Sequence, residues 1–127
     1  QLANIQQKLE RLGKGTEMPA CWADSKTGKV EYIFRIDLTS IGLIIHDLKL
    51  PNRIEEQALL PLEAITFDQE LSQEQFLIQT GALFQWGKNR GCRFFVIARD
   101  LTEVQEKNIY KAMLRTVENH FYKLVTE

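Results

Sequence analysis

Two histidines are the first candidates for acid–base or metal chemistry. His46 lies in a stretch rich in β-branched residues, and His120 comes at the end of a run with helical spacing. A zinc site needs further His or Cys ligands four residues away or across a short loop, and the sequence offers none near either histidine. We therefore expect both to be structural, with no catalytic or metal-binding role.

Four aspartates stand near the ends of expected strands: Asp24, Asp37, Asp47 and Asp100. Carboxylates gathered at strand ends could form a catalytic constellation, but Asp is also a common turn and cap residue, because its side chain accepts hydrogen bonds from nearby backbone N–H groups. We favour the turn interpretation. The glycines match neither GxGxxG nor GxxxxGK[ST], so no nucleotide loop is predicted. We expect no catalytic residue, no cofactor and no metal.

The two cysteines, Cys21 and Cys92, are a candidate disulfide. In an oxidising compartment their thiols would be expected to pair, whereas in the cytosol they would stay reduced and buried. A bridge would close a loop of about 70 residues and contribute about 4 kcal/mol on the chain-entropy model. It would also attach the segment before the first strand to the core. The sequence leaves open the alternative of two separate packing cysteines.

The clearest strand that could position such groups covers residues 30–38, where the side chains alternate strictly. One face carries Val30, Tyr32, Phe34, Ile36 and Leu38, and the other Glu31, Ile33, Arg35 and Asp37. Residues 39–42 predict a turn, and residues 43–48 form a second β-branched run, so a hairpin is expected. Residues 51–71 contain two prolines and fit a long connection with one turn of helix or a short edge strand, and we assign neither.

Two helices are predicted in the second half of the chain. Ser72 and Gln75 form a capping box that begins a helix ending near residues 87–91. Thr102 and Gln105 predict a second capping box and a second helix.

Two further strands accompany these helices. Residues 92–98 are nearly all apolar, which predicts a central strand buried on both faces. Residues 121–126 could finish the second helix or form a last strand, and their alternation favours the strand.

The first residues resemble a coiled-coil seam. Apolar side chains recur at steps of three and four residues, at Leu2, Ile5, Leu9 and Leu12. So short a helix is marginal alone, which predicts the end of a longer helix that is dimeric or docked. An ordinary amphipathic helix packed on its own domain is the alternative. Gly13 and Gly15 end the helix.

The expected order is ββαβαβ, an α+β fold in which two helices pack on one face of a small sheet. A short N-terminal helix, the end of a coiled-coil stalk, precedes it. We divide the chain into a stalk helix (residues 1–14), a linker (residues 15–29) and an α+β interaction domain (residues 30–127).

Composition and charge exclude several classes of protein. The chain has 127 residues, of which 44% are hydrophobic and 26% charged, as in ordinary globular domains. Its 16 Lys and Arg against 17 Asp and Glu leave a net charge of −1, and the basic residues are scattered. Nucleic acid and anionic membrane surfaces require a concentrated positive face, so we expect neither as a partner. The apolar runs are also too short to span a bilayer.

This layout resembles the extracytoplasmic domain of the ExbD/TolR biopolymer-transport family. The best stretch is residues 94–127, where a strand ending in Ala98, Arg99 and Asp100 precedes a helix and a terminal segment, similar to the family's strand ending in Ala-Asp and its last αβ unit. Less characterised membrane proteins that accompany MotA/TolQ/ExbB-type proton channels also share a stalk followed by such a domain. The family's transmembrane helix and membrane aspartate would lie before Gln1, and no functional residue is carried over.

The resemblance implies a non-catalytic, periplasmic or extracytoplasmic interaction domain, anchored to the inner membrane by a segment upstream of this sequence. Such a domain would transmit force or bind a protein partner, for example a MotA/TolQ/ExbB-type channel subunit, and would be a homodimer through its N-terminal helix. Strand pairing at an exposed sheet edge is a simple way to make such a contact. The alternative is a cytoplasmic, dimeric regulatory or adaptor module that binds a protein or a small effector.

Overall fold

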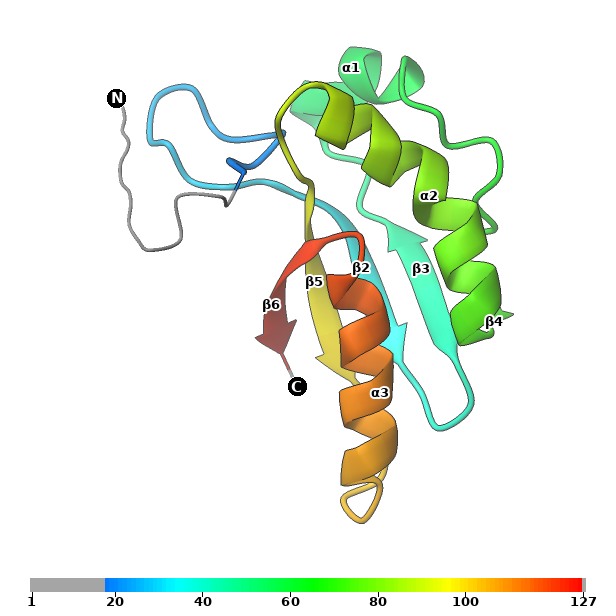
Figure 1. Cartoon of the computed structure of the whole chain (residues 1–127). Coiled ribbons are helices and arrows are strands. Elements are labelled where there is room, and N and C mark those ends of the chain that lie inside the picture. Colours follow the sequence, from blue (N-terminus) through cyan, green and yellow to red (C-terminus); the bar gives the residue numbers. More distant parts are fainter. Residues whose placement is uncertain (1–17, 127) are drawn as a thin grey trace.

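The computed structural model describes residues 18–126, which form a five-stranded mixed sheet with its two long helices on one face (Figure 1). The predicted stalk helix and its seam, Leu2, Ile5, Leu9 and Leu12, lie outside the described residues. The elements are β2 (Tyr32–Leu38), β3 (Leu43–Asp47), the 3-10 turn η1 (Pro51–Arg53), α1 (Ile54–Ala58), β4 (Glu70–Leu71), α2 (Gln73–Asn89), β5 (Phe95–Asp100), α3 (Lys107–Glu118) and β6 (Tyr122–Thr126). The predicted α+β class and ββαβαβ order are confirmed, with η1, α1 and β4 added in the long connection.

The sheet has the strand order β4-β3-β2-β5-β6. β2 and β3 form the predicted antiparallel hairpin, closed where the Thr39 N–H donates to the Gly42 carbonyl at 2.9 Å. β5 pairs in parallel with β2 on one side and with β6 on the other. Because parallel neighbours need a crossover connection, α2 and α3 carry the chain back between these strands.

Helix α2 begins as the sequence predicts. The Ser72 side chain accepts from the Gln75 N–H at 3.1 Å, and the Gln75 side chain accepts from the Ser72 N–H at 2.9 Å, which completes the capping box. Its buried side is a single stripe of Phe76, Thr80, Leu83 and Gly87.

The second predicted capping box is wrong. Helix α3 begins only at Lys107, and the side chain of its N-cap, Glu106, makes no capping hydrogen bond. The Thr102 hydroxyl donates instead to the Asp100 carboxylate at 2.6 Å, so it closes a turn at the end of β5. Asp100 also accepts from the Thr102 backbone N–H at 2.9 Å, which is the donor that the Gln105 side chain would need for a capping box.

Two predictions about strand faces also need correction. Tyr32 pairs with Phe95 and Phe34 pairs with Val96, so β2 carries one extra residue, Ile33, in a bulge. Tyr32 therefore lies on the face opposite Phe34. The run at residues 92–98 leads into an interior strand, β5, with a neighbour on each side. It is not buried on both faces, because alternate residues of β5, among them Phe95, remain partly exposed.

The core lies between the sheet and the helices. Phe121 packs against Phe34 and Phe76, with ring centroids 6.2 Å and 6.1 Å apart, and so joins the sheet to α2. Trp22, from the predicted linker, is buried against Phe94 at 5.4 Å. The segment before β2 therefore contributes to the core.

Gly42 offers a test of how closely the hairpin approaches β4. A Cβ added there would lie 2.2 Å from the Leu71 carbonyl oxygen, whereas a Cβ at Gly81, in the middle of α2, meets nothing within 4 Å. We predict that Gly42→Ala lowers the free energy of unfolding by about 3 kcal/mol, because backbone must move apart. Gly81→Ala should raise it by about 0.5–1 kcal/mol through helix propensity. Urea unfolding of both variants checks this, and equal effects would contradict the close approach.

Candidate interaction surface

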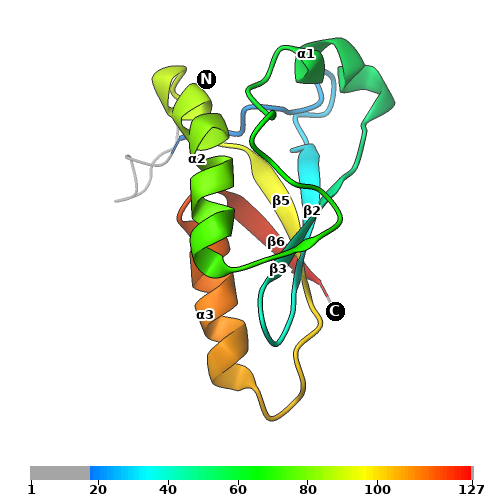
Figure 2. The ribbon, with the colours of Figure 1, turned by 90° about the vertical axis from the view of Figure 1, so that its right-hand side faces the viewer.

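Helices α2 and α3 cover one face of the sheet and leave the other, which we call the open face, without a long helix (Figure 2). The pairing register places Arg35 and Asp37 of β2, Ile44 and His46 of β3, and Phe95, Ile97 and Arg99 of β5 on this face, with Tyr122, Leu124 and Thr126 of β6. These side chains mix apolar groups with charges at the centre of the sheet.

Asp37 is the most enclosed charged group of the open face, with its side chain only 4% exposed. Arg99 donates to both carboxylate oxygens, from Nε and Nη2, at 3.0 Å each. Arg35 Nε adds a bond of 3.2 Å, and His46 Nε2 lies 2.9 Å from Oδ2. The other ring nitrogen of His46 lies 2.7 Å from Asp68 Oδ1, so the imidazole connects two carboxylates.

This arrangement keeps Asp37 ionised. Burial opposes the charge, but the hydrogen bonds from Arg99, His46 and Arg35 outweigh it and hold the pKa of Asp37 below its ordinary value of 3.8. Because donors already occupy both oxygens, the carboxylate is not available as a general base. The Asp37 carboxylate instead fixes the guanidinium groups of Arg35 and Arg99 on the open face. The Arg35 side chain is 33% exposed and the Arg99 side chain 37%.

A ladder of aromatic rings crosses the same face at its other end. Tyr32, Phe95 and Tyr122 come from three adjacent strands, with centroid separations of 6.3 Å and 5.0 Å. The Arg93 guanidinium lies 5.0 Å from the Tyr122 ring and donates to the Glu118 carbonyl. Its Nε is buried without a hydrogen-bond partner among residues 18–126.

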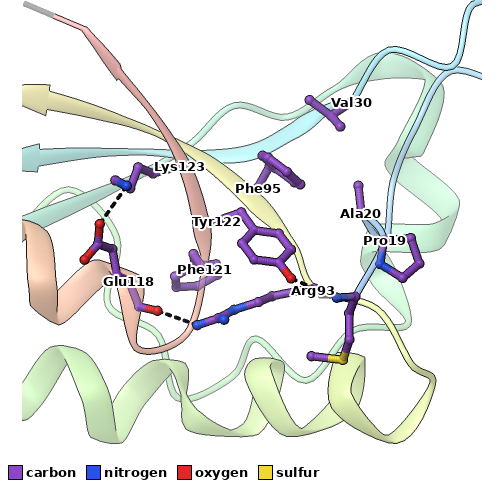
Figure 3. Close-up of a pocket in the computed structure, with 10 residues that line it drawn as sticks. Pro19, Ala20, Val30, Arg93, Phe95, Glu118, Phe121, Tyr122 and Lys123 are labelled. Atoms are coloured by element: carbon purple, nitrogen blue, oxygen red, sulfur yellow. Dashed lines mark hydrogen bonds and ion pairs between the residues drawn. The ribbon is translucent and has the colours of Figure 1, made fainter. Parts of the chain in front are cut away.

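A groove of about 540 Å³ lies beside this ladder. Figure 3 shows the side chains that line it. Pro19, Ala20 and Val30 line one side, and Phe95, Tyr122 and Lys123 line the other. The Met18 N–H donates to the Tyr122 hydroxyl at 2.9 Å, so the described chain enters the domain at the rim of the groove. Arg93, Glu118 and Lys123 also line the groove, so its wall combines apolar and charged side chains.

Strand β6 forms one edge of the sheet, and in the described part of the chain nothing pairs with its outer side. The Tyr122 N–H donates to the Phe94 carbonyl, so by strand alternation the N–H groups of Lys123 and Val125 point away from β5. Leu124 and Val125 are 48% and 40% exposed. This edge therefore presents free main-chain donors and apolar side chains together.

The candidate disulfide is confirmed: Cys21 and Cys92 are bonded, with Cα atoms 4.9 Å apart. The last turn of α2 packs directly on it, since a Cβ at Gly87 would lie 3.2 Å from Cys21 Sγ and 2.9 Å from the Cys92 carbonyl oxygen. The bridge fixes the entering segment to the start of β5. A disulfide indicates an oxidising, extracytoplasmic environment.

The aspartates differ in role. Asp24, Asp47 and Asp100 accept backbone N–H bonds from residues two or three positions ahead, as the turn interpretation predicts. For Asp37 that interpretation is wrong. The one available signal was its position two residues after Arg35, which places both side chains on the same face of a strand.

The two histidines are held by neighbouring side chains. His46 belongs to the Asp37 cluster. His120 Nδ1 lies 2.8 Å from the Thr80 hydroxyl, and its ring stacks on Phe84 at 4.7 Å. Burial, with the nearby Arg93 charge, lowers the pKa of His120.

Comparisons with protein-family models, curated proteins and solved structures found no match. No helix within residues 18–126 is both long enough and apolar enough to cross a membrane. Over the same residues, no three His, Cys, Asp or Glu side chains are grouped so that they could hold a metal ion.

We predict that Asp37→Asn lowers the free energy of unfolding by about 2–3 kcal/mol at neutral pH, because charge-assisted hydrogen bonds are lost from an enclosed site. Since the folded pKa of Asp37 is depressed, this contribution is present above pH 3.8 and is lost as the pH falls through the folded value. Denaturant unfolding at several pH values should therefore show the two proteins converging in acid.

Asp68→Asn is the matched control, because the Asp68 side chain is 72% exposed and contacts only the other side of His46. Asn also tolerates the positive φ of 63° at this position. A change of less than about 0.5 kcal/mol is expected. An Asp37 variant as stable as this control would contradict a structural role for the cluster.

Proposed function

We propose that the chain is a non-catalytic interaction domain of a membrane-tethered protein, exposed outside the cytoplasm and working as a force-transducing or partner-binding subunit of a proton-channel complex. The observation that carries the proposal is the open face. Parallel strands normally have both faces covered by other elements. In this domain α2 and α3 cover a single face of β2, β5 and β6 and leave the opposite face open (Figure 2).

The chemistry of the open face supports binding rather than catalysis. Ile44 and Ile97 lie beside two guanidinium groups that Asp37 fixes in position. Pre-positioned cations among apolar side chains favour a protein partner that brings carboxylates and apolar groups, because little side-chain freedom is lost on binding.

Two further features support the tether. The disulfide fits an oxidising compartment and makes the entry of the chain rigid, so a force on the preceding segment would reach β5 through a covalent bond. The ββαβαβ order is also the one that the resemblance to ExbD/TolR domains implies. On this proposal the partner is a MotA/TolQ/ExbB-type channel subunit or another envelope protein.

The first test uses a photo-crosslinking phenylalanine analogue in the full-length protein in its native cells. At Ile44, on the open face, irradiation should join the domain to a membrane-complex or envelope protein, identified by mass spectrometry. At Ile78, exposed on α2 and far from that face, it should not. Equal products at the two positions, or none at Ile44, would argue against the open face as the binding surface.

The second test counts free thiols in the denatured protein taken from native cells before reductant is added. We expect none, because both cysteines of the sequence are bonded to each other. Two free thiols would indicate a reducing compartment and favour the cytoplasmic adaptor hypothesis instead.

A further inference from the structure

The outer edge of β6 lacks the features that normally keep edge strands from pairing. Proteins protect such edges with bulges, prolines or free lysines. β6 pairs with β5 in an unbroken register from Tyr122 to Thr126 and contains no proline. Its one lysine, Lys123, is tied to Glu118 at 2.6 Å, which leaves Leu124 and Val125 as the exposed apolar side chains of the edge.

We propose that this edge binds the β6 strand of a second copy of the chain, antiparallel and centred on Leu124. The two sheets then form one continuous ten-stranded sheet across a two-fold axis. Lys123 and Val125, whose N–H groups point outward, exchange main-chain hydrogen bonds with Val125 and Lys123 of the other copy. The proposal goes beyond the proposed function, since it assigns a surface separate from the one around Ile44.

The side chains select this register. Centring on Leu124 places Leu124 opposite Leu124, Lys123 opposite Val125 and Tyr122 opposite Thr126, so like charges do not face each other. Centring one residue earlier would place the two Lys123 side chains directly opposite each other, which is destabilising.

The path of the chain favours a second copy over another protein. Met18 binds the Tyr122 hydroxyl, and Tyr122 lies two residues, or about 7 Å, from Leu124 along the strand. The described chain therefore begins close to the proposed two-fold axis in both copies, and a homodimer is also what the sequence pattern of Leu2, Ile5, Leu9 and Leu12 predicts. A five-residue strand pair alone buries less than the roughly 1,200 Å² of a stable interface, so we expect it to strengthen a dimer that has a further contact rather than to hold the dimer alone.

The test is a disulfide trap in the full chain. Both native cysteines are already bonded to each other, so Leu124→Cys introduces a single free thiol. In the proposed register residue 124 faces itself at a non-hydrogen-bonded position, where Cα atoms about 4.5 Å apart allow a disulfide. Mild oxidation of the purified protein should therefore yield covalent dimers on a non-reducing gel.

Val125→Cys is the register control. Residue 125 faces Lys123 of the other copy, and its own counterpart lies on a diagonal, so we expect at least about fivefold less dimer than with Leu124→Cys. Ile78→Cys, exposed on α2, gives the background yield of chance collisions. A Leu124→Cys yield no higher than either control would overturn the proposal.

Val125→Pro, combined with Leu124→Cys, tests strand pairing itself. The proline removes an N–H that β5 does not use, so the melting temperature should change little while dimer formation falls to the Ile78→Cys background. Undiminished dimer at an unchanged melting temperature would show that the copies meet without strand pairing and would also overturn the proposal. Either failure leaves the Ile44 crosslinking test intact, so the proposed function is judged separately.

Discussion

The parallel pairing of β2 with β5 is the constraint on which the rest of the structure depends. Its register places Asp37 beside Arg99 on the open face and Ile36 beside Ala98 on the helix face. A shift of one residue would exchange the two faces and put the charges against the helices. The bulge at Ile33 adjusts this pairing at one end, so that Tyr32 joins Phe95 in the aromatic ladder.

The Cys21–Cys92 disulfide extends this order to the point where the chain enters the domain. The Arg93 N–H donates to the Pro19 carbonyl, and the Arg93 carbonyl accepts from the Cys21 N–H. These two bonds pair the segment around Ala20 with the residues just before β5, and the disulfide adds a covalent link to that pairing. Because Gly87 lets α2 approach the bridge, the helix, the start of β5 and the entering segment are in contact at one point.

Local signals allowed much of the fold to be predicted from the sequence. The alternation of residues 30–38 and the Ser72–Gln75 capping box depend on neighbours in sequence, and both gave elements close to those observed. The prediction of a second capping box was wrong because Asp100, and not Gln105, accepts from the Thr102 backbone N–H. The open-face cluster could not be predicted, because the Asp37–Arg99 bonds join residues 62 positions apart and depend on the strand register.

The two faces of the sheet have different roles: the helix face carries the packed core, and the open face carries the exposed groups of the proposed binding surface. The contacts of Phe34, Phe76 and Phe121 hold the helix face together without any group from the open face. Arg35 and Arg99 contribute less to folding than their number of bonds suggests, because solvent reaches a third of each side chain and screens them. Their orientation still depends on Asp37, which is enclosed. Substitution of exposed side chains on the open face could therefore alter which partner binds, while the buried Asp37 carboxylate keeps Arg35 and Arg99 in place.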